Sequence, residues 1–348
     1  MATKTFMSFS NMAAFHGCAK KISFNDLSSI LSKFPMCVDK NVVIGLNEAD
    51  DIVAYKINDT DAIVQSLDFM PPITNDPYIF GKIVAANALG DIYAKGCKPL
   101  FALNILSYPL KSSSMSDLEK ILLGGADKSN EAGVCVIGGH SVDGDEPYYG
   151  MSVTGIAKVD NIVSNSTARP GDMLFLTKPI GTGAILNGVK YSLLPSGAID
   201  EAIASMCELN KSASEAMMEV GINACTDVTG FGLLGHLYEM IKASNVGACI
   251  NFFDIPFLEN LFSMDETDAL PIASKHTLQH ISCSTEWTGS YSDYEKRVLA
   301  DPQTSGGLLI SVSAKNAPRL VEVFKQKNLF IACLGKITEG ATTINIVK

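Results

Sequence analysis

Strand-like and helix-like runs alternate along the whole chain, and this alternation restricts the available folds more than any other feature. The strand candidates are the apolar or alternating runs at 52–57, 62–67, 101–107, 134–137, 150–158, 173–177 and 247–253. The helix candidates are the segments at 79–95, near 115–131, near 199–220 and at 232–243, with a final αβ unit over 306–347. Such an alternation predicts an α/β or α+β architecture.

A short polar segment divides the chain into two parts. Residues 164–172 read SNSTARPGD, a small, polar stretch with Pro and Gly that is typical of a linker. The length of 348 residues also favours two domains. We therefore expect a flexible glycine- and cysteine-bearing segment at 1–20, one domain at 21–163 and a second at 164–348.

The charge balance excludes several classes of partner. The 37 Asp and Glu residues outnumber the 27 Lys and Arg residues, which gives a net charge of −10. A chain this acidic is a poor candidate for sequence-independent binding to nucleic acid or to an anionic membrane. It has only three arginines, so bound phosphate would depend on lysine, backbone N–H groups or metal ions.

The cysteine pattern and the hydropathy indicate the compartment. The nine cysteines are scattered singly and form no C-x-x-C pair, so neither a disulfide framework nor a structural zinc site is expected. No apolar run approaches the roughly 20 residues of a membrane helix. We expect a cytoplasmic protein.

A thiol lies beside two lysines near the N-terminus. Cys18 follows Gly17 and precedes Lys20 and Lys21. Neighbouring ammonium groups lower the pKa of a thiol and favour the reactive thiolate. The alternative is a chain terminus whose cysteine has no chemical role.

Aspartates stand where predicted strands and helices begin or end. They are Asp50 and Asp51 before a strand, Asp68 after a strand, Asp91 on the 79–95 helix four residues after Asn87, and Asp227 before another helix. Oxygen ligands from separate elements, with no arginine nearby, suit Mg²⁺, which prefers carboxylates, water and substrate phosphates. The alternative is that each aspartate is a helix cap or a turn residue.

Two glycine-rich turns have more than one interpretation. Gly138 and Gly139 follow a predicted strand and precede His140 and Ser141, an arrangement that suits either a phosphate cradle of backbone N–H groups or a plain turn. Residues 230–235 satisfy G-x-G-x-x-G, the dinucleotide fingerprint. The weak strand before this motif and the negative charge of Asp227 argue against a dinucleotide site.

Taken together, these motifs resemble the selenophosphate synthetase (selenide, water dikinase) family over essentially the whole chain. The matching segments are GCAKK at 17–21, DD at 50–51, NALGDIYAKG at 87–96, GGHS at 138–141, TDVTGFGLLGH at 226–236 and DPQTSGGLL at 301–309. Most of these are shared with the wider superfamily that includes aminoimidazole ribonucleotide synthetase. The glycine–thiol segment followed by lysine is more specific.

The resemblance implies a reaction and a fold. ATP, hydrogen selenide and water would give selenophosphate, AMP and phosphate. The fold would be the two-domain aminoimidazole-ribonucleotide-synthetase-like fold, in a homodimer whose N-terminal sheets join into a barrel. A selenium-delivery protein is a further partner to be expected.

The resemblance also implies a role for each matching residue. Cys18 and Lys21 fall on catalytic positions, and Lys21 would also contact the nucleotide. The Mg²⁺ ligands would be Asp51, Asp91 and Asp227. The nucleotide contacts would be Glu48, Ala49, Asp50, Asp68 and Asp91, with Gly139, His140 and Ser141 reaching ATP from the partner subunit. Two positions depart from the family pattern: Lys20 replaces a frequent second cysteine, and Glu48-Ala49 replaces a usual Thr-Arg.

Three other functions compete with this interpretation. Another ATP-dependent kinase or ligase of the superfamily would release ADP instead of AMP. A catalytically silent ATP-binding relative would ordinarily lack the thiol or its lysine. A dinucleotide oxidoreductase would bind a nicotinamide cofactor.

Overall fold

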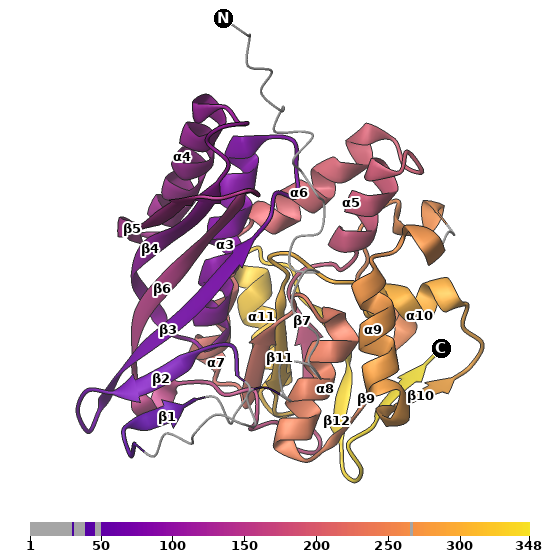
Figure 1. Cartoon of the computed structure of the whole chain (residues 1–348). Coiled ribbons are helices and arrows are strands. Elements are labelled where there is room, and N and C mark those ends of the chain that lie inside the picture. Colours follow the sequence, from indigo (N-terminus) through magenta and orange to yellow (C-terminus); the bar gives the residue numbers. More distant parts are fainter. Residues whose placement is uncertain (1–29, 31–38, 46–49, 265–266) are drawn as a thin grey trace, which may run out of the picture.

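Two β-sheets, one in each half of the chain, form the frame of the molecule (Figure 1). The computed structural model describes residues 30, 39–45, 50–264 and 267–348. Four of the predicted site residues lie outside these ranges: Cys18, Lys21, Glu48 and Ala49. Within the described ranges, no helix is long and apolar enough to cross a membrane.

The first sheet has six strands in the order β1-β2-β3-β6-β4-β5. These strands are β1 (Val42–Ile44), β2 (Val53–Lys56), β3 (Asp61–Met70), β4 (Lys98–Tyr108), β5 (Cys135–Asp143) and β6 (Tyr148–Lys158). All neighbours are antiparallel except β4 and β5, which are parallel because α4 connects them. The predicted strands at 62–67, 101–107, 134–137 and 150–158 are confirmed as parts of this sheet.

Two helices, α3 (Pro77–Ala94) and α4 (Met115–Ala132), cover one face of this sheet. Asp76 caps α3 by accepting hydrogen bonds from the backbone of its first turn, and Pro77 occupies the first position. Gly133, at a φ of 79°, ends α4 in the left-handed conformation that glycine adopts without strain. The two helices predicted over 79–95 and 115–131 are confirmed.

The opposite face of the first sheet carries exposed apolar side chains. Along β3 the side chains alternate between buried and exposed, as a strand requires. The outward apolar residues on β2, β3 and β4 are Val53, Tyr55, Ile63, Leu67, Phe69 and Leu103. We call this set the open face.

The second sheet has seven strands in the order β10-β13-β9-β12-β7-β11-β8. They are β7 (Met173–Leu176), β8 (Ala224–Asp227), β9 (Gly247–Asn251), β10 (Thr285–Thr288), β11 (Leu308–Val312), β12 (Ala332–Thr338) and β13 (Ile344–Val347). Both parallel and antiparallel pairs occur, so the sheet is mixed.

Helices lie on both faces of the second sheet. The helices of the second half are α5 (Thr182–Lys190), α6 (Ile199–Cys207), α7 (Lys211–Val220), α8 (Gly232–Ser244), α9 (Ile272–Ile281), α10 (Asp293–Leu299) and α11 (Ala317–Gln326). One apolar core packs α8 against one face, and another packs α7 and α11 against the other. The predicted helical region near 199–220 is two helices, because the backbone of Glu208 is extended and ends α6.

The helix α3 connects the two halves. It packs on the first sheet and α4, and it also contacts α6, α7 and β8 of the second half. Nearly every side of α3 is therefore buried, although Asn87 and Asp91 are polar. These two residues lie where both halves meet the helix, and this position makes them site candidates.

Candidate active site

Three carboxylates converge at the junction of the two halves. One oxygen from each of Asp51, Asp91 and Asp227 lies within 4.8 Å of the other two. Asp51 precedes β2, Asp91 lies on α3, and Asp227 ends β8. We call this group the acidic triangle. Its geometry suits one divalent cation, because carboxylates at this spacing repel one another unless a cation lies between them.

The close approach of β8 to α3 depends on a glycine. A Cβ atom placed on Gly90 would lie 2.7 Å from Oδ2 of Asp227. This is closer than two such atoms can approach, so any side chain at position 90 would push Asp227 away from Asp91. Asp91 therefore supplies one carboxylate of the acidic triangle, and Gly90 leaves the space that the facing carboxylate of Asp227 occupies.

A buried lysine lies next to the acidic triangle. The ammonium of Lys95, at the end of α3, forms ion pairs with the carboxylates of Asp50 and Asp51, the latter at 2.8 Å. Burial by itself would raise the pKa of Asp51, but the Lys95 ammonium, His236 and hydrogen bonds from Lys95 and Thr226 outweigh it. The pKa of Asp51 therefore lies below its usual value, and Asp51 is ionised at neutral pH, as a metal ligand must be.

A hydrogen bond from the second half holds Asp51 from another side. Thr226, the neighbour of Asp227 on β8, donates its hydroxyl to Oδ2 of Asp51 at 2.9 Å. His236 on α8 is buried behind this region and contacts Glu239 at 3.1 Å. Burial lowers the pKa of His236, but the bond to Glu239 and the charges of Glu239, Asp51 and Asp227 outweigh it, so the net shift is upward.

Asn87 connects a second acidic residue to the site. Its Nδ2 donates to Oδ2 of Asp68 at 2.8 Å, and its Oδ1 accepts from the backbone N–H of Ser305 at 2.9 Å. Asn87 and Asp91 lie one turn apart on the same side of α3, as the sequence predicts. The side chain of Asp68, at the end of β3, is therefore oriented by an amide that also binds the second half of the chain.

The carboxylate of Asp50, a predicted nucleotide-contacting residue, is bound by protein groups. Its side chain is 0% exposed and is bound by Lys95. It also accepts hydrogen bonds from the Ser164 hydroxyl at 3.1 Å and from the Asn165 backbone at 3.3 Å. These protein partners attach the start of β2 to the linker, so the structure places this carboxylate in a structural role and away from any open surface.

The predicted contact residues 139–141 lie on β5, at the edge of the first sheet. The strand register places Gly139 in one row with Asp68, separated from it by β6 and β4. Three strand spacings amount to roughly 14 Å. The structure thus does not bring residues 139–141 of a chain next to its own Asp68. His140 shares the open face with Leu103.

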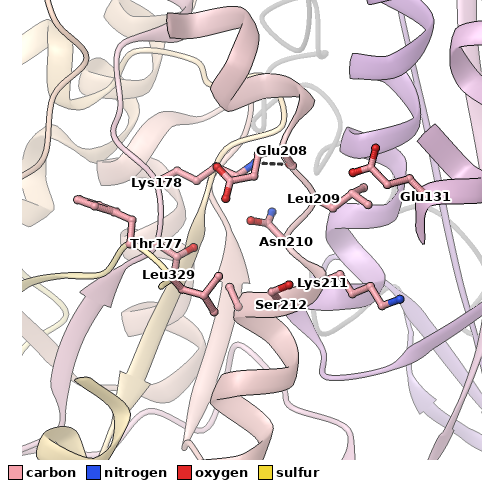
Figure 2. Close-up of a pocket in the computed structure, with 11 residues that line it drawn as sticks. Glu131, Thr177, Lys178, Glu208, Leu209, Asn210, Lys211, Ser212 and Leu329 are labelled. Carbon is pink, nitrogen blue, oxygen red and sulfur yellow. Dashed lines mark hydrogen bonds between the residues drawn. The ribbon is translucent and has the colours of Figure 1, made fainter. Parts of the chain in front are cut away.

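A separate cavity of about 340 Å³ opens between the two halves (Figure 2). Its lining includes Glu131 of α4, Lys178 after β7, and the turn between α6 and α7. The ammonium of Lys178 donates to the carbonyl oxygens of Ser205, Glu208 and Ser305, at 3.0, 2.7 and 2.9 Å. Burial lowers the pKa of Lys178 to about 8. All three donors are occupied, so Lys178 connects backbone segments and is not an open cation.

Sequence reasoning missed two residues of this site, Lys95 and Thr226. Lys95 follows Asp91 by four positions on the same helix, and this spacing was the available signal. Thr226 adjoins Asp227, but nothing in the sequence shows that its partner would be Asp51, 175 residues away. His236, the last residue of the 226–236 segment, is packed and only 4% exposed.

Comparison with known families defines the class first. The model described as "AIR synthase related protein, N-terminal domain" matches residues 49–157, and its C-terminal counterpart matches 169–348. The two matches together cover most of the chain, so its fold is that of an AIR synthase related protein. Curated relatives named selenide, water dikinase include one from Carboxydothermus hydrogenoformans, 44% identical over 92% of this chain and 93% of that relative. Another, from Clostridioides difficile, is 42% identical over 90% of each chain. The chain belongs to the selenide, water dikinase family.

Solved structures share the fold at lower identity. A thiamine-monophosphate kinase from Stenotrophomonas maltophilia superposes with a TM-score of 0.67 at 16% identity, covering 92% of this chain and 94% of the other. A chain of a HypE–HypF complex has a TM-score of 0.65 at 19% identity, covering 93% and 95%. Together with the family matches, these similarities confirm the predicted two-domain fold.

Proposed function

We propose that the acidic triangle is the Mg²⁺ centre at which this enzyme uses ATP and selenide to make selenophosphate. The convergence of Asp51, Asp91 and Asp227 within 4.8 Å is the observation that carries the proposal. The curated relatives carry the name of the activity. The three ligands come from both halves of the chain, so the centre would form only when the two halves are packed together.

The donor set fits magnesium. All three groups are carboxylates, the lowered pKa of Asp51 keeps it ionised, and no soft ligand is among them. When bound there, Mg²⁺ would neutralise charge on the phosphate oxygens, which phosphoryl transfer needs more than it needs an acid or a base. Arginine side chains could also neutralise phosphate charge, but the chain has only three arginines.

The nucleotide would lie along the side of the triangle where β3 ends. Asp68, oriented by Asn87, is the proposed contact there. Glu48 and Ala49 replace the usual Thr-Arg of the family, so we expect their contacts with ATP to come from the backbone. For Asp50 itself, whose carboxylate has protein partners, we also expect a backbone contact.

The selenium chemistry would belong to the N-terminal segment. We assign Cys18, as a thiolate, to holding or delivering selenide, a soft nucleophile that sulfur handles well, and Lys21 to stabilising the phosphoryl group as it transfers. The same thiolate is the group on which a selenium-delivery protein would act. The support for both assignments is the sequence GCAKK at 17–21 and its resemblance to the family.

A second copy of the chain would complete the site. The open face exposes several large apolar side chains, among them Leu67 at 56% and Phe69 at 55%, which a monomer rarely leaves uncovered in one patch. Its continuation onto β5 includes His140. A dimer formed through this face, as a barrel of two sheets, would place residues 139–141 near the nucleotide of the partner subunit.

Phosphorus NMR with ATP, Mg²⁺ and selenide tests the whole proposal. We expect selenophosphate, AMP and phosphate to appear together. Cys18→Ser should abolish this selenide-dependent turnover while ATP binding survives, and Cys283→Ser, at an exposed cysteine away from the triangle, should not. ADP without AMP would instead favour the alternative of another kinase of the superfamily. Full activity of Cys18→Ser would refute the role given to the thiol.

A further inference from the structure

Lys95 touches all three elements that carry the acidic triangle. It lies at the end of α3, four residues after Asp91. Its ammonium pairs with Asp51 at 2.8 Å and donates to the backbone oxygen of Cys225, also at 2.8 Å. Cys225 lies on β8, two residues before Asp227. One side chain thus connects the positions of the three carboxylates to one another.

The ammonium has no capacity left for a substrate. Its three N–H donors are matched by Asp50, Asp51 and the Cys225 carbonyl, and the side chain is 0% exposed. Lys95 therefore cannot hold phosphate as an exposed lysine would. A direct catalytic role is excluded by the same contacts, and what remains is an effect on its neighbours.

The contacts fix the rotation of one ligand. Oδ2 of Asp51 receives both short bonds, from Lys95 at 2.8 Å and from Thr226 at 2.9 Å. Among the described residues, Oδ1 has only a longer contact, with Thr226 at 3.2 Å. Two bonds from different directions on one oxygen hold the carboxylate plane, so the orientation of the other oxygen is determined before a cation arrives.

We propose that Lys95 is a positioning residue for the metal centre, a resident cation that holds Asp51, α3 and β8 in the arrangement that binds Mg²⁺. This inference rests on the proposed metal centre. Burying an ammonium is costly, and it is tolerated here because two carboxylates and a carbonyl surround it. Without it, Asp50 and Asp51 would face each other in a buried space with no cation between them, and Asp51 would turn away.

Removing Lys95 has two opposite effects on the affinity for a divalent cation, so the direction of the change decides between them. Loss of a nearby positive charge alone would strengthen divalent-cation binding through Coulomb attraction. Loss of positioning would weaken it. We expect positioning to dominate, because a ligand that rotates away contributes nothing to the site.

The experiment measures Mn²⁺ binding to the folded full-length protein by electron paramagnetic resonance, well below the unfolding temperature. In Lys95→Met we expect the Mn²⁺ dissociation constant to rise at least tenfold. Lys128→Met removes another buried lysine, paired with Glu131 on α4, and should leave the constant within twofold. Lys95→Gln keeps donors for Asp51 and Cys225 and should weaken binding less than Lys95→Met; if the Met variant does not fold, weakening in the Gln variant decides in its place.

Each outcome separates the inference from the proposed function. Unchanged or tighter Mn²⁺ binding in Lys95→Met overturns the positioning role. Asp51→Asn serves as the reference, because it removes a proposed ligand directly. If Asp51→Asn also binds Mn²⁺ normally, the metal centre itself is wrong and the inference falls with it. If only Asp51→Asn loses binding, the centre stands and the role of Lys95 does not.

Discussion

The hydroxyl of Thr226 donates a hydrogen bond at 2.9 Å to the carboxylate of Asp51, across 175 positions of sequence. Asp51 lies at the start of the first family domain, and Thr226 lies in the second. The acidic triangle is therefore built across the contact between two domains. Changes that disturb this contact should affect metal binding before they affect the fold of either domain.

Asp227→Asn should remove most of the activity. The amide keeps the size of the side chain but loses the charge that a divalent cation requires, so we expect turnover to fall at least 100-fold or to require far higher Mg²⁺. AMP release as a function of Mg²⁺ concentration measures this. The control is Asp293→Asn, at the start of α10 far along the chain, which should behave as wild type.

Asn87→Ala should weaken both stability and ATP use. The substitution leaves the buried N–H of Ser305 without its acceptor, at a cost of about 1–3 kcal/mol in the free energy of unfolding. It also releases Asp68, so the KM for ATP should rise several-fold. Urea denaturation and steady-state kinetics measure the two effects. An unchanged KM would contradict the orienting role, and Gln326→Ala, on α11, is the neutral control.

Gly81→Ala should destabilise the packing of α3 on α4. A Cβ at this position would lie 2.0 Å from the backbone oxygen of Ile121, which cannot move aside easily. Overpacking of this kind costs about 1–3 kcal/mol or more, and exceeds the roughly 1 kcal/mol that alanine contributes to helix formation. We expect a net loss of about 2 kcal/mol in urea denaturation. Gly197→Ala, where the added atom meets nothing within 4 Å, should change stability by less than about 0.5 kcal/mol.

Because of Asp301, the free energy of unfolding should fall as the pH rises from about 4 to 7. Burial raises its pKa from 3.8 to about 7, against the opposing effect of hydrogen bonds from Ala184 and Gln303. Between these two pKa values, Asp301 is protonated in the folded chain and ionised in the unfolded chain. The free energy of unfolding therefore falls by about 1.4 kcal/mol per pH unit in this range. Asp301→Asn cannot ionise. The difference in unfolding free energy between wild type and this variant should follow that slope, and a flat difference would contradict it.

Phe69→Glu should convert the proposed dimer into a monomer. The side chain is 55% exposed on the open face, where a carboxylate would be buried without a partner in a dimer. Sedimentation velocity measures the oligomeric state. Leu123→Glu, at a residue 52% exposed on α4, carries the same charge on a surface outside the proposed interface and should remain dimeric. A monomeric wild type at micromolar concentration would contradict the proposal.

Local signals predicted the elements of the first half well. The largely apolar run at 79–95 predicts most of α3, and the run at 62–67 predicts the middle of β3. These patterns act over a few residues, so no partner element is needed to interpret them. The region near 199–220 has an equally clear helical pattern, but the break at Glu208 depends on its backbone oxygen accepting from Lys178.

The aspartates show the limit of the same reasoning. The family resemblance implies Asp51, Asp91 and Asp227 as one ligand set, and the fold brings them together. Asp50 stands beside Asp51 in the sequence and has the same chemistry, yet its carboxylate is closed off by Lys95 and the linker. Adjacent residues point to different environments, and only the packing around them distinguishes a ligand from a structural ion pair.

Most of the helices and strands, the family and the acidic residues could be predicted from the sequence, because these depend on side-chain chemistry and on spacing along the chain. The contacts that hold Asp51 against Lys95 and Thr226 and that bury Asp50 could not. Those contacts join residues that are far apart in sequence. Their free energy comes from the exclusion of water where the two halves meet α3, and this environment does not exist until the chain is folded.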